Sequence, residues 1–385
     1  MAEQTDGAWF FQAGENLAAD IAHVPDTGRV LMKGNEALAE AAIIAGCRHY
    51  FGYPITPQNE IPSYFSRRMP QVDGCFLQAE SEPAAINMVF GTSAAGKRVM
   101  TSSSSPGISL MQEGISYLAG AQLPTVIASV MRGGPGLGNI SGAQGDYNQA
   151  VKGGGNGDYH CIVLSPSCAQ DIAELTVLAF DLADRYRMVV MLLLDGYLGQ
   201  MAEPLFMPQL LPHYRRPRQE GYVLDGAKER PGRKISSIKL NDDHQGLETH
   251  VLDLFATTYK AVEQSESRAI LEEGAELLLC AYGMPARLCR EAKARLQGLG
   301  ISVALFQPLT LWPFPKVQLL RALEMLRPQA KILVVEMSMG QFAADVKLHC
   351  YGSNAEVDCY GTAGGSPPTV NEIVKRVVEK VKQNV

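Results

Sequence analysis

From Val30 onward the chain repeats one unit, in which a short apolar run leads through a turn of Gly, Pro, Ser or Thr into an amphipathic helix. This alternation is typical of stacked βαβ units, which set their strands side by side in a parallel sheet. Some runs, such as VVMLLLD at 189–195, are apolar throughout, as strands covered by helices on both faces must be. The sequence therefore predicts an α/β fold built on an open parallel sheet.

The first series of these units predicts strands and helices in alternation. We expect strands at residues 49–54, 74–80, 98–103, 125–131, 160–165 and 189–195, and helices at residues 34–45, 83–95, 108–119 and 169–186.

A second series follows a long interruption. Between about residues 203 and 268 the periodicity gives way to proline- and charge-rich sequence, which is typical of a connection between domains. Because 385 residues also exceed the ~100–200 that one domain usually holds, we expect two domains. The predicted divisions are an N-terminal extension at 1–28, a first domain at 29–212, a linker at 213–270 and a smaller α/β domain at 271–385.

The charge and hydropathy of the chain argue against several classes of protein. A formal net charge of -6 disfavours nucleic-acid binding, which needs a basic face, and direct docking of an acidic electron carrier. No apolar run approaches the ~20 residues that cross a bilayer. The first residues have neither the basic nor the apolar region of a secretory signal. We therefore expect a cytoplasmic protein that engages no membrane.

The eight cysteines show no spacing that organises a metal. None of them forms a C-x-x-C pair or another arrangement typical of zinc or iron–sulfur ligands. We interpret them as reduced, packed side chains and predict no metal site in this chain.

Two stretches resemble phosphate-binding loops without meeting their requirements. The run GTSAAGKR at 91–98 has Arg98 where a P-loop needs Ser or Thr to reach magnesium. The glycine-rich run at 132–158 contains no G-x-G-x-x-G and does not open the first βα unit. A nucleotide site is therefore unsupported.

Candidate functional residues follow the predicted strands, at the sheet edge where open α/β folds bind ligands. In GYPITP at 52–57, Thr56 precedes Pro57, a pair that also suits a plain helix cap. In QAESE at 78–82, we expect Glu80 to be buried at a strand end and Glu82 to be solvated on the next helix.

Two further segments place polar groups at the same edge. TSSSSPG at 101–107 sets hydroxyls before a helix, and VMRGGPG at 130–136 ends an apolar strand in Arg132. A lone arginine is commonly a surface or ion-pair residue. At a buried strand end before glycines, its planar fork of donors also suits recognition of a carboxylate.

Together, GYPITP, QAES, TSSSSPG, MRGGPG, LGQMAEP and YGTAGGSPPT resemble the alpha-type subunit of 2-oxoacid:ferredoxin oxidoreductases, and within it the 2-ketoisovalerate (branched-chain) group. The resemblance runs from about Val30 to the end of the chain. It implies a first domain of the pyrimidine-binding type found in thiamine-diphosphate enzymes. The second domain would resemble the C-terminal domain of transketolase.

The resemblance also implies roles for individual residues. Glu80 would contact the aminopyrimidine of thiamine diphosphate, with Tyr53 and Pro54 beside the cofactor. Thr56 and Arg132 would face the carboxylate of the substrate. Glu80, Arg132 and Thr56 are thus the expected catalytic residues.

One motif of thiamine-diphosphate enzymes is missing. Such enzymes hold the diphosphate and Mg²⁺ with a GDG motif and a later Asn, whereas the nearest match here, LDGYLG at 194–199, has Leu194 in place of the first Gly. The resemblance therefore implies a beta-type partner that carries this site. It also implies gamma and ferredoxin-like subunits with the iron–sulfur clusters, assembled as a dimer of heteromers.

The implied reaction is oxidative decarboxylation of a 2-oxoacid with coenzyme A, which yields an acyl-CoA and CO₂ and passes electrons to ferredoxin. A 2-ketoisovalerate type is favoured, and 2-oxoglutarate and pyruvate types remain open. Two rivals are a carboligating transferase of the transketolase or deoxyxylulose-phosphate type and a non-catalytic scaffold subunit of the same complex.

Overall fold

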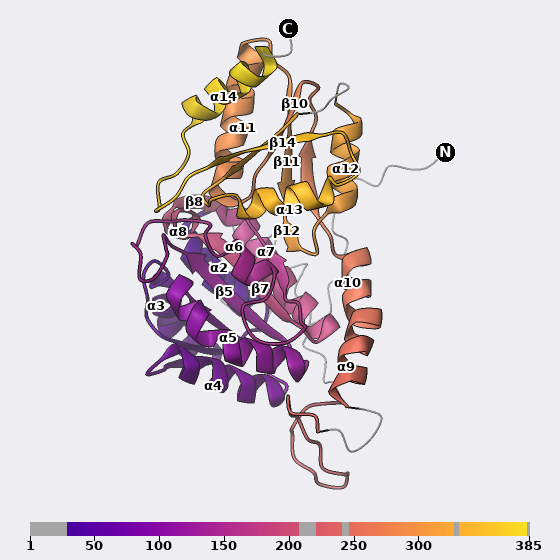
Figure 1. Cartoon of the computed structure of the whole chain (residues 1–385). Helices are drawn as coiled ribbons and strands as arrows, with labels where there is room; N and C mark the ends of the chain where they lie inside the picture. Colours follow the sequence, from indigo (N-terminus) through magenta and orange to yellow (C-terminus); the bar gives the residue numbers. More distant parts are fainter. Residues whose placement is uncertain (1–28, 208–220, 241–245, 327–330, 383–385) are drawn as a thin grey trace, which may run out of the picture.

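The computed structural model describes residues 29–207, 221–240, 246–326 and 331–382. The N-terminal extension at 1–28 lies outside these residues. The described chain forms two sheets with their helices, of seven and five strands, stacked one above the other (Figure 1). A separate two-stranded ribbon pairs β1 (Val30–Lys33) antiparallel with β8 (Ala202–Leu205).

The seven-stranded sheet carries the first series of βα units. All its strands run parallel except the edge strand β12. In spatial order they are β12 (Thr310–Trp312), β6 (Ile162–Leu164), β7 (Val189–Asp195), β5 (Thr125–Met131), β4 (Val99–Ser103), β2 (His49–Gly52) and β3 (Cys75–Gln78).

Helices cover both faces of this sheet. Because crossovers are right-handed, the helices that lead to β3 and β7 lie on one face, and those that lead to β4 and β5 lie on the opposite face. One layer packs α2 (Gly34–Ile44) against α3 (Glu60–Arg68) and α7 (Ala169–Tyr186), and the other pairs α4 (Glu82–Ala94) with α5 (Ser105–Gly120). The shorter helical segments are η1 (Met69–Val72), α6 (Tyr147–Val151) and α8 (Gly196–Gln200).

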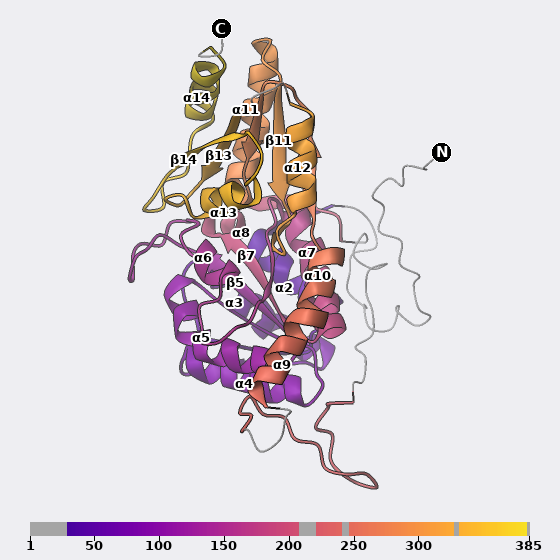
Figure 2. The ribbon, with the colours of Figure 1, turned by 45° about the vertical axis from the view of Figure 1, so that its right-hand side comes forward.

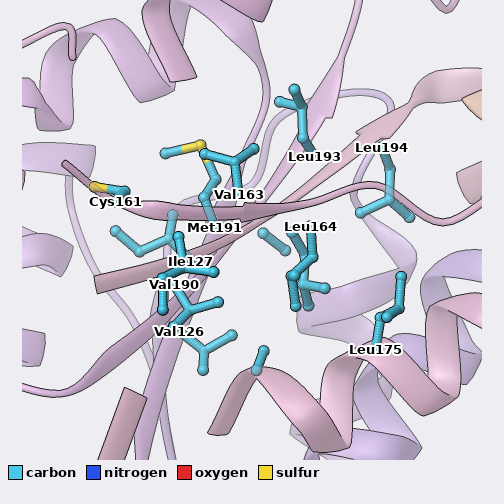
Figure 3. Packing of buried hydrophobic residues seen from close by; sticks show 14 of the residues in the cluster. Val126, Ile127, Cys161, Val163, Leu164, Leu175, Val190, Met191, Leu193 and Leu194 are labelled. Atoms are coloured by element: carbon cyan, nitrogen blue, oxygen red, sulfur yellow. The ribbon is translucent and has the colours of Figure 1, made fainter. Parts of the chain in front are cut away.

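The core lies along the central strands. Every residue of β5 and β7 is buried, which explains why both runs are apolar along almost their whole length. Figure 3 shows side chains of β5, β6 and β7 packed together, among them Val126, Val163 and Met191. Of these strands, β5 leads into Arg132, and β7 ends in Asp195.

The five-stranded sheet belongs to the second domain. Its order is β14 (Glu356–Gly361), β13 (Lys331–Glu336), β10 (Leu277–Cys280), β11 (Val303–Pro308) and β9 (Ala269–Glu272), with only β9 antiparallel among these strands. Helices α11 (Gly283–Gly298) and α14 (Val370–Lys382) cover one face. On the other, α12 (Lys316–Glu324) and α13 (Gln341–His349) join the core of the first domain.

Two features differ from a simple division into domains. Residues 247–265, inside the expected linker, form α9 (Leu247–Asp253), the π-helical η3 (Leu254–Tyr259) and α10 (Lys260–Ser265), which run beside the first domain (Figures 1 and 2). Strand β12, which follows the first strands of the second sheet in the chain, belongs to the sheet of the first domain. In the described part of the chain, no helix is both long and apolar enough to span a membrane.

Buried polar contacts join the two domains. Gln144 binds the backbone of both Tyr282 and Met337, with its Nε2 donating to the Tyr282 carbonyl at 2.9 Å. Asp195, at the end of β7, accepts from the Met284 amide at 2.8 Å. Burial raises the pKa of Asp195 to about 6, against the lowering effect of its backbone hydrogen bonds.

Candidate active site at the carboxyl edge of the first sheet

The candidate residues meet beside β2 and β4. These strands are neighbours, and the chain leaves them in opposite directions, from β2 toward β3 and from β4 toward β5. Such a reversal opens a crevice outside the carboxyl ends of the strands, where α/β sheets bind ligands. Residues 53–58, 80–82, 103–107 and 132–142 all follow strands that end at this edge.

The turn after β2 is fixed by a residue that sequence reasoning missed. Gln58 is fully buried; its Nε2 donates to the Tyr53 carbonyl at 3.1 Å, and its Oε1 accepts from Ser102 Oγ at 2.6 Å. Asn35 of α2 donates to the Pro57 carbonyl at 2.9 Å. This support leaves Tyr53 37% exposed at the open side of the turn, with Pro54 also exposed.

The two carboxylates after β3 are placed opposite to expectation. Glu80 is exposed, whereas Glu82 is only 5% exposed, so the predicted burial of the first and solvation of the second are wrong. The reason is the start of α4, where the Ser81 hydroxyl accepts from the Ala84 amide and makes Glu82 the first helical residue. A Ser-Glu-Pro sequence is a sign of such a start, and could have revealed it.

Glu82 faces the turn between β4 and α5. A Cβ atom on Gly107 would come within 2.5 Å of Glu82 Oε1 and 2.0 Å of Ser103 Oγ, so only glycine fits there. Within the described residues, the buried Ser103 and Ser104 hydroxyls beside Glu82 have no hydrogen-bond partner. Buried polar groups are normally satisfied, which marks this corner as a place for a ligand.

Arg132 lies on the other side of the same turn. It is 8% exposed, and its guanidinium donates to the Thr56 carbonyl at 2.9 Å and to the Leu137 carbonyl at 3.0 Å. Its buried Nε has no partner among the described residues. The structure thus brings Arg132 and Thr56 together through the Thr56 backbone carbonyl.

The 103–107 turn links the two sides. The Arg132 amide donates to Ser105 Oγ at 3.0 Å, and Ser105 Oγ donates to Asp146 at 2.5 Å. Burial raises the pKa of Asp146, while the Ser105 hydrogen bond and the positive charge of Arg132 oppose that rise. Ser105 therefore lies between the cation Arg132 and the carboxylate Asp146.

A diphosphate and metal site is not evident at this edge. Asp195, in the near-match to a GDG motif, is 1% exposed, and its two oxygens accept from the Leu198 and Met284 amides. In the described ranges, no three His, Cys, Asp or Glu side chains are grouped so as to hold a metal.

Comparison with known proteins identifies the family of this chain. Residues 40–250 match the thiamine-diphosphate-binding domain of pyruvate flavodoxin/ferredoxin oxidoreductases, and residues 275–373 match core domain II of pyruvate:ferredoxin oxidoreductase. The chain belongs to the 2-oxoacid:ferredoxin oxidoreductase family. As a member of this family, the chain is a subunit of an enzyme with several chains, since its relatives are described as subunits.

Relatives with different substrates share most of this oxidoreductase subunit. It is 45% identical over 351 residues to the ketoisovalerate oxidoreductase subunit VorB of Methanothermobacter marburgensis, covering 91% of this chain and 97% of the relative. It is 33% identical over 368 residues to the 2-oxoglutarate synthase subunit KorA of Methanocaldococcus jannaschii, covering 90% and 98%.

Solved structures support the fold of the oxidoreductase subunit. The 2-oxoglutarate:ferredoxin oxidoreductase of Magnetococcus marinus, solved with 2-oxoglutarate, coenzyme A and succinyl-CoA bound, matches with a TM-score of 0.81 at 28% identity. The match covers 92% of this chain and 66% of that one. A split-gene transketolase, described as an inactive beta4 tetramer, shares the fold with a TM-score of 0.57 at 14% identity. The expected pairing of pyrimidine-type and transketolase-like domains is confirmed.

Proposed function

We propose that this chain supplies the pyrimidine side of the active site of an enzyme that oxidatively decarboxylates a branched-chain 2-oxoacid. The products would be an acyl-CoA, CO₂ and two electrons for ferredoxin. The observation that carries the proposal is that two buried charged residues flank the 103–107 segment: Glu82 lies against Gly107, and the Arg132 amide binds Ser105 Oγ.

The surroundings of Glu82 and Arg132 suit a different role for each of them. Thiamine diphosphate, when bound, supplies the electron sink that decarboxylation of a 2-oxoacid needs. The Glu82 carboxylate accepts a hydrogen bond or a proton from the pyrimidine ring, in the role that the sequence had suggested for Glu80. Ser103 and Ser104 offer hydroxyls to the same ligand. Arg132 binds the substrate carboxylate with the N–H groups that the two carbonyls leave free.

The substrate preference rests on the charges around Arg132. Among the described residues of this edge, at 53–58, 80–82, 103–107 and 132–142, Arg132 is the only cation. A 2-oxoacid with a second carboxylate would lack a partner within these residues. Leu137 and Ile140, on the loop after Arg132, are instead apolar. These features favour 2-ketoisovalerate, as does the identity to a ketoisovalerate oxidoreductase subunit.

The helix pair α4 and α5 is the surface we assign to a beta-type partner. These helices contain two charged residues in 29, whereas α11 and α14, also 29 residues together, contain eleven. Helices facing water normally carry charge on their outer face. Leu110, 58% exposed, lies on this uncharged surface, and α4 begins at Glu82. A partner seated there reaches the site and would contribute the diphosphate and Mg²⁺ ligands.

The remaining partners follow from the chemistry. Two electrons must leave the site, and no grouping of ligands for an iron–sulfur cluster is found in the described part of this chain. Ferredoxin-like and gamma subunits of a dimer of heteromers would carry the clusters in the cytoplasm and deliver the electrons to ferredoxin.

The function is tested with the reconstituted complex and a viologen acceptor. We expect kcat/KM to be highest for 2-ketoisovalerate among that acid, 2-oxoglutarate and pyruvate. The isolated chain should be inactive and bind thiamine diphosphate with Mg²⁺ negligibly by calorimetry. Micromolar binding without a partner would refute the divided site, and a preference for 2-oxoglutarate would refute the substrate assignment.

The partner surface is tested separately by Leu110→Lys. The variant should fold normally, as judged by circular dichroism, but fail to co-elute with the beta-type subunit. Leu299→Lys is the matched control, because Leu299 is 63% exposed beyond the end of α11. Equal co-elution of both variants would exclude the α4–α5 surface.

A further inference from the structure

The loop after Arg132, residues 132–142, is closed on itself by Asn139. The Asn139 amide donates to the Gly133 carbonyl at 2.8 Å, and its side-chain Oδ1 accepts from the Ser141 amide at 3.0 Å. The Gly133 amide in turn donates to the Ser141 carbonyl at 2.9 Å. The Arg132 guanidinium binds the same loop through the Leu137 carbonyl. The position of the guanidinium and the shape of the loop are therefore linked.

Asn139 also ties this loop to the second domain. Its Nδ2 donates to the Gly364 carbonyl at 2.6 Å, in the glycine turn that follows β14. The next residue of that turn, Gly365, lies so close that a Cβ on it would approach Ser141 Cβ to 2.5 Å. Gly365 also accepts a 2.6 Å hydrogen bond from the Tyr197 hydroxyl of α8, outside the loop.

We infer that Asn139 is a positioning residue for substrate recognition, through which the second domain holds the Arg132 loop in its binding geometry. This inference rests on the proposed role of Arg132. Asn139 uses its oxygen for the shape of the loop and its nitrogen for the contact with the second domain. The second domain thereby sets how firmly the site holds a 2-oxoacid, although Asn139 does not itself touch the substrate.

The two functions of the amide can be separated by substitution. Asn139→Asp keeps an acceptor for Ser141 but replaces the donor to Gly364 with an oxygen that repels the carbonyl. Loss of one hydrogen bond changes a binding equilibrium by about 2- to 12-fold. The added repulsion should place the effect of Asn139→Asp on substrate binding at the upper end of this range. Tyr197→Phe is the control, since it removes the other hydrogen bond to the glycine turn and leaves in place the ring that lies beside Gly142.

The experiment measures kcat and KM for 2-ketoisovalerate in the reconstituted complex, with thiamine-diphosphate content checked. Asn139→Asp should raise KM about 5-fold or more with kcat within about twofold, while Tyr197→Phe leaves KM within about twofold. If Asn139 acts through Arg132, the effect should disappear in an Arg132→Met background.

Three outcomes would overturn the inference. These are an unchanged KM in Asn139→Asp, an equal rise in Tyr197→Phe, and full additivity with Arg132→Met. Failure of the proposed function is distinguishable, because it would appear as a wild-type complex that does not turn over 2-oxoacids or as an Arg132→Met variant with normal KM.

Discussion

Gly107 lies so close to Glu82 that a β-carbon on residue 107 would come within 2.5 Å of the carboxylate oxygen Oε1. The first turn of α5 thus leaves just enough space for a buried acid at the start of α4. Any side chain at position 107 would therefore displace this acid.

Glu82→Gln should lose about 10²–10⁴ in turnover, the usual worth of a positioned proton-transfer group. Glu80→Gln is the matched control two residues away; it should stay within about twofold of the wild type, because Glu80 is exposed. Turnover of both complexes is measured with cofactor occupancy verified. A larger loss in Glu80→Gln would return the assignment to that residue.

Gly107→Ala should lower turnover by displacing the Glu82 carboxylate or the Ser103 hydroxyl. A clash of this kind commonly costs about 1–3 kcal/mol in stability, which thermal unfolding would report. Gly298→Ala is the control, because no atom lies within 4 Å of a Cβ at that helical position. It should keep full activity; normal turnover in Gly107→Ala would remove Glu82 from the reaction.

Arg132→Met should raise the KM for a 2-oxoacid while thiamine-diphosphate content stays normal. Removing one partner of a desolvated charge pair costs about 2–5 kcal/mol. Arg132→Lys should recover only part, because an ammonium cannot hold two backbone carbonyls and a carboxylate in one plane. Steady-state kinetics decide the matter, and an unchanged kcat/KM in the Met variant would make Arg132 a purely structural residue.

Asp195, which joins the two domains, should make the protein less stable to unfolding as the pH rises from about 4 to about 6. Its pKa is raised by burial to about 6 in the folded protein, from 3.8, so between these values the unfolded chain ionises first. Stability from this group is therefore greatest below pH ~4 and falls as pH rises toward ~6, by at most about 3 kcal/mol. Unfolding of wild type and Asp195→Asn from pH 4 to 7 measures it; a parallel pH dependence in both would contradict the prediction.

The bounds of the two central strands could be predicted to the residue. Both strands are buried along their whole length, so the apolar run in the sequence and the strand in the structure have the same ends. The predicted strands at 125–131 and 189–195 coincide with β5 and β7, and the helix at 169–186 coincides with α7. The sequence does not predict the β1–β8 ribbon. Strand β8 pairs with β1, which is far away in the chain, and it contains a proline, a residue that disfavours strands.

The site could be predicted only in outline. Arg132 and Thr56 meet because both follow parallel strands of one sheet. The burial of Glu82 depends instead on where α4 begins and on the space left by Gly107, which is a contact between distant parts of the chain. Gln58 was missed for a similar reason, because its partners are a turn carbonyl and Ser102 on another strand.

Strand β12 has a consequence for how the protein is made. Residues 310–312 close one edge of the first sheet by pairing with β6, so this sheet remains unfinished during synthesis until most of the chain has left the ribosome. A fragment that ends near residue 270 would expose the backbone of β6 as a bare edge, which invites pairing with other chains. We expect such a fragment to aggregate on expression, although it contains every residue assigned to the site.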